Sequence, residues 1–284
     1  MMASLIEKIY SFSFTLLGIN IDSENMSGTI YSLLNMSTTN GILSNKFELY
    51  PLVSTIHSVV VPIAESLLVL FFLINLIKML TQEGVERVSW ERITLRACVF
   101  FLLDHFIKNS VTYMGYVADV VQNDIFTGII GQLGVSNTTL NLGETLASII
   151  EAQGTFDGIV YGVVFIILAI PYMATIIMIL SQVFLRAVKL LIYIMFSPIP
   201  MALAAEGETY RGKCIAYFMS FAGVCFEAIF IYIGLYIYCK GLSGTVVDEI
   251  GVMTVIVKVL FLNGLFSALI GLSSQLSEKM FGRG

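Results

Sequence analysis

The 28 residues 158–185 contain no charged side chain, and this uninterrupted apolar stretch is the strongest constraint on the fold. A helix needs about 20 apolar residues to cross the hydrocarbon core of a bilayer, which is about 30 Å thick. The whole chain of 284 residues is 57% hydrophobic and only 12% charged, whereas about a quarter of the residues of a water-soluble domain are charged. The composition therefore excludes a soluble globule and predicts an integral membrane protein.

Hydropathy divides the chain into an extracytoplasmic N-terminal segment, residues 1–50, and a membrane domain, residues 51–284. The membrane domain predicts an all-α polytopic fold, because its apolar stretches are long enough to span the bilayer. Five spans are expected, at 52–79, 97–121, 158–182, 214–239 and 252–272.

The N-terminal segment begins with helical periodicity. Leu5, Ile9, Phe12 and Leu16 recur at helical spacing beside charged and hydroxyl side chains, which predicts an amphipathic helix over residues 4–17. Such a helix is expected to lie on the membrane surface or on a partner subunit.

The second expected span is the least apolar. Asp104, Lys108, Thr112 and Asp119 fall on one stripe of a helix, and ionisable groups are costly in lipid. This face is therefore expected to meet protein or water.

Residues 186–213 combine a broken helix with a charged turn. Pro198 and Pro200 lack a backbone N–H, and a proline disfavours helix in the preceding residue, so a helix through 190–196 is expected to break at Ser197. Irregular backbone at membrane depth is tolerated only where protein or water surrounds it. Residues 190–205 are too short for an ordinary span, and we expect a re-entrant or subunit-buried hairpin on the cytoplasmic side. The charged turn that follows contributes Glu206, Glu208, Arg211 and Lys213.

The distribution of lysine and arginine predicts the orientation. With the N-terminus outside, ten basic residues fall on the inner side and three on the outer side, which satisfies the positive-inside rule. The ten are Lys78, Arg87, Arg92, Arg96, Arg186, Lys189, Arg211, Lys213, Lys279 and Arg283. The C-terminus is then inside, and residues 122–157 form a long outer loop.

Ionisable residues within the expected spans are candidates for function, because they usually face a bundle interior or a water path. They are Glu65, Asp104, Lys108, Glu227 and Lys258. Structural ion pairing and a transport role both remain open. Glu227 and Lys258 are expected at similar depths in the last two spans, so we predict an ion pair between them. The alternatives are a snorkelling Lys258 and a Glu227 that is protonated or bound to another subunit.

No motif predicts an enzyme, a cofactor or a metal site. Residues 207–214 resemble the phosphate loop GxxxxGK[ST], but Cys214 replaces the hydroxyl that holds magnesium and Glu208 would repel phosphate. His57 and His105 stand apart from any Cys/His cluster. The net charge of −5 argues against a basic nucleic-acid-binding surface.

About fifty residues around the broken helix resemble a known family. Arg186 and Lys189 precede SPIP at 197–200, a small and acidic turn follows at 202–209, and FMSFAGVCFEAIFI occupies 218–231. This order resembles the TrbL-type polytopic membrane subunit of conjugative type IV secretion systems, in its Gram-positive form.

The resemblance implies a non-enzymatic channel or scaffold subunit, homo-oligomeric in the cytoplasmic membrane. Its implied partners are other secretion membrane subunits, separate secretion ATPases, and single-stranded DNA in transit with its bound relaxase. The alternative function is a secondary transporter or ion channel with a solute site at the broken helix. A secondary transporter is expected to show an internal repeat of its span pattern. The sequence contains no evident repeat.

Overall fold

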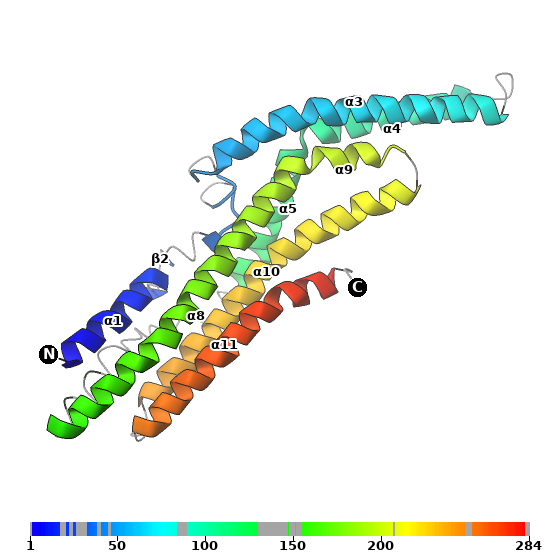
Figure 1. Cartoon of the computed structure of the whole chain (residues 1–284). Coiled ribbons are helices and arrows are strands. Elements are labelled where there is room, and N and C mark those ends of the chain that lie inside the picture. The colour runs from blue at the N-terminus through cyan, green and yellow to red at the C-terminus, as the bar shows by residue number, and fades with distance from the viewer. Residues whose placement is uncertain are drawn as a thin grey trace. The chain divides into compact units, whose positions relative to one another are not determined.

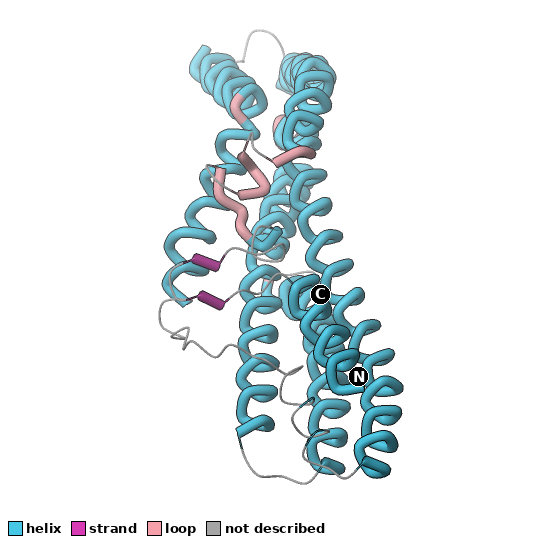
Figure 2. Tube along the Cα trace, turned by 90° about the vertical axis from the view of Figure 1, so that its left-hand side faces the viewer, coloured by secondary structure: helices cyan, strands magenta, loops and turns pink. Residues whose placement is uncertain are grey.

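The computed structural model describes residues 2–17, 21–22, 25–26, 33–38, 41–44, 47–83, 90–129, 147, 151, 155–206, 208–247 and 252–281. Within these residues the chain is helical apart from turns and two strands of two residues each, as Figure 2 shows. The strands are β1 (Ile21–Asp22) and β2 (Asn25–Met26), and they pair antiparallel.

Figure 1 shows the helices along the chain. In order they are α1 (Met2–Leu17), α3 (Tyr50–Glu83), α4 (Trp90–Lys108), α5 (Ser110–Val120), the π-helix η1 (Val121–Phe126), α8 (Thr155–Phe196), α9 (Pro198–Leu203), α10 (Glu208–Val247) and α11 (Val252–Met280).

Four helices in the described part of the chain are long and apolar enough to cross a membrane. They are Tyr50–Thr81, Asp157–Phe196, Tyr210–Tyr238 and Ile256–Met280. They indicate a membrane-embedded, all-helical protein, which agrees with the fold class that hydropathy predicts.

The expected second span, residues 97–121, is not among these four. It is divided between α4, α5 and the start of η1. Asn109 separates the first two and turns its side chain back on the helix, where Nδ2 donates to the His105 carbonyl at 3.0 Å. Asparagine competes with the helical backbone in this way. Arg96, Asp104 and Lys108 also lower the apolar character of α4.

The other helices extend past the predicted spans. α8 continues to Phe196, fourteen residues beyond 182, and its 42 residues are about 63 Å long at 1.5 Å per residue. α10 begins at Glu208, so Arg211 and Lys213 lie on its first turns instead of in the predicted charged turn. Of the predicted outer loop 122–157, residues 130–146, 148–150 and 152–154 lie outside the described residues.

The chain forms two compact units. Unit 1 comprises Met1–Asn35, Ile125–Ala187 and Phe226–Ser277, and unit 2 comprises Met36–Asp124, Val188–Cys225 and Glu278–Gly284. Because α8 and α10 are continuous helices, each contributes residues to both units.

In unit 1, α1 packs on α8. The Tyr10 hydroxyl donates to the Phe165 carbonyl at 3.2 Å, and its ring lies 5.2 Å from that of Tyr172. Burial raises the pKa of Tyr10. Of the predicted apolar ridge of α1, Ile9 is half-buried and Leu5 is 47% exposed, while the side chains of Phe12 and Leu16 lie outside the described residues. Ile6 and Tyr10 are the fully buried residues beside them. The tyrosine pair, which pattern reasoning about aliphatic residues overlooks, sets the buried face.

Unit 1 also contains an antiparallel pairing of α10 with α11. The Tyr238 hydroxyl donates to Asn263 Oδ1 at 2.7 Å, and the rings of Tyr238 and Phe266 stack with their centroids 4.5 Å apart. Gly234 lies close to the same ring, because a Cβ there would stand 3.5 Å from Phe266 Cε2. These contacts fix the register of the two helices.

In unit 2, α3 and α4 form an antiparallel hairpin and α9 packs against both. Figure 1 shows the three helices side by side. Phe72 lies against Phe100 with ring centroids 4.9 Å apart, and Glu65 lies near Lys108. The residues of α3 that make these contacts recur at helical spacing, so one stripe of α3 faces its neighbours.

Candidate functional site

α8 ends at Phe196 and α9 begins at Pro198, so the predicted break at Ser197 is confirmed. Ser197 is buried, and its hydroxyl donates to the Ile194 carbonyl at 2.9 Å. Pro198 occupies the first helical position of α9, where its missing N–H leaves no donor unsatisfied. Pro200 follows within the same six-residue helix. The prolines thus stop one helix and start another.

α9 is covered by α3 and α4. Met201 and Ala202 are buried in an apolar cluster with Ala64 and Leu68 of α3 and Ile107 of α4. The two prolines are less uniformly covered: Pro198 is buried and Pro200 half-buried. This packing meets the requirement that broken backbone be surrounded by protein.

Asn75 satisfies the backbone at the end of the broken segment. Its Nδ2 donates to the Ala205 carbonyl at 2.7 Å, and Arg96 Nη1 donates to the Asn75 carbonyl at 2.8 Å. Carbonyls beyond a helix end have no intrahelical partner, and Asn75 supplies one. The sequence analysis did not single out either residue. The available signal was that Asn75 lies on the stripe of α3 that faces its neighbours, and that Arg96 lies at the matching level of α4.

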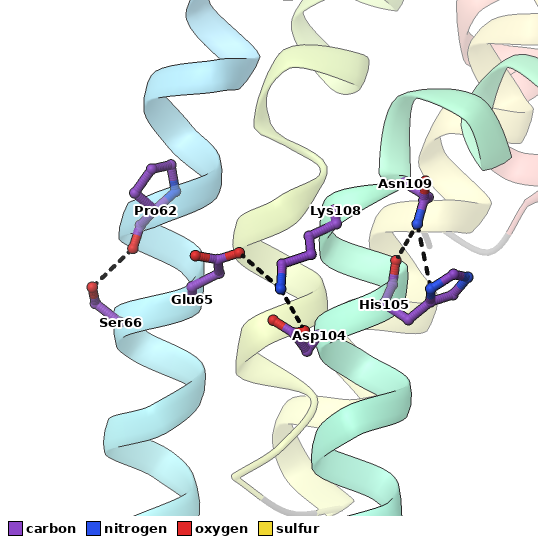
Figure 3. A network of polar contacts seen from close by, with 7 residues as sticks. All are labelled: Pro62, Glu65, Ser66, Asp104, His105, Lys108 and Asn109. Carbon is purple, nitrogen blue, oxygen red and sulfur yellow. Dashed lines mark hydrogen bonds and ion pairs between the residues drawn. The ribbon is translucent and has the colours of Figure 1, made fainter.

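Beside the apolar cluster lies a charge cluster formed by Lys108, Asp104 and Glu65, shown in Figure 3. Lys108 Nζ stands 2.7 Å from Asp104 Oδ2 and 3.6 Å from Glu65 Oε1. The three side chains are 54%, 26% and 34% exposed, in the order Lys108, Asp104, Glu65. Three of the predicted candidates therefore meet, as an ion-paired group with one excess negative charge.

Three of the four residues on the polar stripe of the second expected span contact protein, one of the two environments that were predicted, protein or water. Asp104 and Lys108 face α3, and Asp119 accepts hydrogen bonds from the backbone N–H and the hydroxyl of Thr38 at 3.0 and 2.7 Å. Thr112 is exposed. Near the same helices His57 Nε2 lies 2.7 Å from Ser110 Oγ, so His57 serves a polar contact between α3 and α5.

The predicted charged turn does not join the charge cluster. Glu206 is half-buried, and Arg211 and Lys213 are exposed on α10. Lys213 Nζ lies 4.7 Å from the centre of the Tyr210 ring, which is a cation–π contact. Glu208 is the first residue of α10, and its side chain lies outside the described residues.

The predicted pair of Glu227 and Lys258 is wrong. Tyr238 of α10 lies opposite Asn263 and Phe266 of α11, so the antiparallel register places Lys258 opposite residue 244. Glu227 is then about 25 Å away along the helix axis at 1.5 Å per residue. The prediction assumed that the fourth span ended at residue 239, whereas α10 continues to Val247 and shifts the hairpin.

Sequence reasoning treated Arg186 only as a basic residue near the membrane surface. The structure buries it completely. Glu227 is buried as well, with 3% exposure, while Lys258 is half-buried. Hydropathy alone gave no sign of the difference between Arg186 and the exposed Lys189.

Comparison of the chain with protein-family models, curated proteins and solved structures found no match.

Proposed function

We propose that the chain is a channel or scaffold subunit of a conjugative type IV secretion system, acting in the cytoplasmic membrane on single-stranded DNA with its bound relaxase. The observation that carries the proposal is the covered broken segment. Residues 197–200 are part of the stretch of about fifty residues that resembles TrbL-type subunits. They end α8 and begin α9, which packs against α3 and α4.

The packing of α9 supports a structural part for this segment. The two prolines of this short helix lack the N–H groups that make regular backbone hydrogen bonds. The hydrogen bond from Asn75 and the burial of the apolar cluster offset the loss of those bonds. No pattern of catalytic residues accompanies it, so we assign no enzymatic activity. The energy for DNA transfer is supplied by separate secretion ATPases in this proposal.

The proposed topology has five crossings, an outside N-terminus and an inside C-terminus. The four apolar helices supply four crossings, and α4 with α5 supplies the fifth. Its ionisable side chains at Asp104 and Lys108 are neutralised largely by each other and by Glu65, which lowers the cost of placing them in a bilayer. Copies of the chain and other secretion subunits surround these helices.

The test is deletion of the coding sequence from a donor cell. Transfer of the marked element to a recipient is expected to stop and to be restored by the intact chain supplied in trans, because no DNA crosses the membrane without the channel assembly. A neighbouring relaxase gene and secretion ATPase genes are also expected. Undiminished transfer by the deletion strain refutes the proposed function.

A second candidate is a secondary transporter or ion channel. The observation that favours it is the charge cluster of Glu65, Asp104 and Lys108 beside the broken helix α9, because transporter sites are built from broken helices and ionisable groups. Under this candidate the deletion strain transfers DNA normally. Purified protein in liposomes then shows solute or ion flux that is lost when Lys108 is replaced by methionine.

A further inference from the structure

Four basic side chains of unit 2 lie near the end of α3 and the beginnings of α4 and α10. All four are exposed, and we call them the basic rim: Lys78 of α3, Arg96 of α4, and Arg211 and Lys213 of α10. The glutamates whose side chains are described in the same part of these helices and the turn before α10 are Glu91, which is exposed, and Glu206, which is half-buried. Among the described side chains, positive charge therefore exceeds negative charge at the rim.

Hydrogen bonds join the α3 and α4 parts of the rim to the end of the broken segment. Arg96 Nη1 donates to the Asn75 carbonyl at 2.8 Å, and Asn75 Nδ2 donates to the Ala205 carbonyl at 2.7 Å. Lys78 lies three residues beyond Asn75, which is about one helical turn. Arg96 and Lys78 therefore lie at the level where the segment containing α9 ends.

α10 reaches the same level from its own beginning. It begins three residues after Ala205, and further along it Phe218 packs against the apolar cluster that contains Leu68. Lys213 lies five residues before Phe218, about 8 Å along the helix. Asn75 lies seven residues after Leu68, about 11 Å along α3. Both steps lead from the apolar cluster toward the end of α9 (Figure 1), so three helices contribute to one rim.

Exposed apolar side chains continue from the rim along the same helices. On α10, Ile215 is 59% exposed and Met219 is 45% exposed. They follow Arg211 by four and eight residues and therefore lie on the same face of the helix. On α4, Val99 is 40% exposed and follows Arg96 by three residues. The basic rim is thus the polar end of apolar helix faces.

This combination of charge and apolar surface fits a phospholipid. Phosphate groups attract clustered lysine and arginine at a membrane surface, and acyl chains cover the apolar side chains next to them. A nucleic acid satisfies the basic groups but leaves the apolar faces in water. Trp90, the single tryptophan of the chain, is 81% exposed at the first residue of α4, and tryptophan is enriched at membrane interfaces.

We propose that the basic rim binds the phosphate groups of anionic phospholipids, whose acyl chains lie along Ile215, Met219 and Val99. The Lys213 ammonium lies 4.7 Å from the centre of the Tyr210 ring, a contact that positions the cation and keeps its charge. The rim holds the end of α3 and the beginnings of α4 and α10 at the headgroup level of the bilayer. This lipid site does not depend on the proposed secretion function.

The test uses the single tryptophan as the reporter. Trp90 lies six residues before Arg96, about 9 Å along α4, and brominated acyl chains quench tryptophan fluorescence at short range. The protein is placed in nanodiscs of phosphatidylcholine and phosphatidylglycerol, with bromine on one of the two lipids. At low salt, brominated phosphatidylglycerol is expected to quench severalfold more than brominated phosphatidylcholine at the same mole fraction. Equal quenching by the two lipids overturns the proposal.

Matched variants separate the rim from the net charge of the protein. The rim variant combines Lys78→Gln, Arg211→Gln and Lys213→Gln, and it keeps Arg96 because that side chain also donates to Asn75. The control variant removes three lysines of unit 1: Lys8→Gln, Lys240→Gln and Lys258→Gln. The rim variant is expected to lose most of the preference for phosphatidylglycerol, and the control variant is expected to keep it. An unchanged preference in the rim variant, or an equal loss in both variants, refutes the proposal.

Two further measurements keep the proposal testable if the rim variant folds poorly. In the wild type, the preference is expected to shrink at high salt, because salt screens exposed charges. A charge-conserving variant with Lys78→Arg, Arg211→Lys and Lys213→Arg is expected to keep the preference. A preference that is insensitive to salt contradicts binding through the rim. Equal quenching by both lipids together with binding of a single-stranded oligonucleotide to the wild type assigns the rim to nucleic acid and overturns the lipid site.

Discussion

Asn75 of α3 donates from Nδ2 to the carbonyl of Ala205 at 2.7 Å, just beyond the end of α9. Its own carbonyl accepts a hydrogen bond from Arg96 Nη1 at 2.8 Å. One residue therefore ties the broken segment to α3 and α3 to α4. Because α9 has only six residues, its position depends on such tertiary contacts and not on helix propensity.

Replacing Asn75 by alanine is expected to destabilise the protein by about 1 kcal/mol, the usual net loss for one hydrogen bond, and by more if the Ala205 carbonyl stays buried without a partner. Thermal unfolding of the detergent-solubilised protein measures the change. The control is Asn123→Ala, at an exposed position of η1. Equal unfolding temperatures for Asn75→Ala and wild type contradict the assigned role.

The charge cluster makes a second prediction. Lys108→Met leaves Glu65 and Asp104 facing each other without a cation, so we expect a lower unfolding temperature and less inserted protein. Adding Glu65→Gln to that variant is expected to restore part of the loss, because it removes one of the two like charges. The control is Glu91→Gln, at an exposed position of α4, the helix that contains Lys108. A tolerated Lys108→Met with no effect on either measure contradicts a structural role for the cluster.

Topology can be tested with single cysteines in a version free of the four native ones. The excess of basic residues on one side predicts that a cysteine at Ser136 reacts with a membrane-impermeant thiol reagent in intact cells, and that one at Glu208 reacts only after the membrane is opened. Labelling at Glu208 in intact cells overturns the cytoplasmic assignment of the region that joins α9 to α10.

Hydropathy and proline chemistry predicted the helical membrane fold, four of the spans and the break at Ser197. These features are local: an apolar run or a missing N–H acts wherever it occurs. The wrong ion pair and the overlooked burial of Arg186 were both set by tertiary packing. The extension of α10 to Val247 separates Glu227 from Lys258, and the full burial of Arg186 depends on which face of α8 its neighbours cover. Neither the extension of α10 nor the burial of Arg186 can be derived from the residue pattern within one helix.

The last prediction concerns Pro198 and Pro200. Proline within a continuous helix costs about 3 kcal/mol, so replacing both by alanine removes the barrier that ends α8 at Phe196. The helix is then free to continue, which pulls Met201 and Ala202 from the apolar cluster with Ala64, Leu68 and Ile107. Membrane insertion is expected to remain normal while DNA transfer falls.

The matched control is Pro171→Ala. Pro171 already lies inside α8, where Thr175 Oγ1 donates to its carbonyl at 2.9 Å, so this change removes a proline without altering a helix end. It is expected to leave transfer unchanged. Equal transfer by wild type, the Pro171→Ala variant and the Pro198→Ala, Pro200→Ala double variant argues that the break is dispensable, because the double variant alters prolines at a helix end and the control does not.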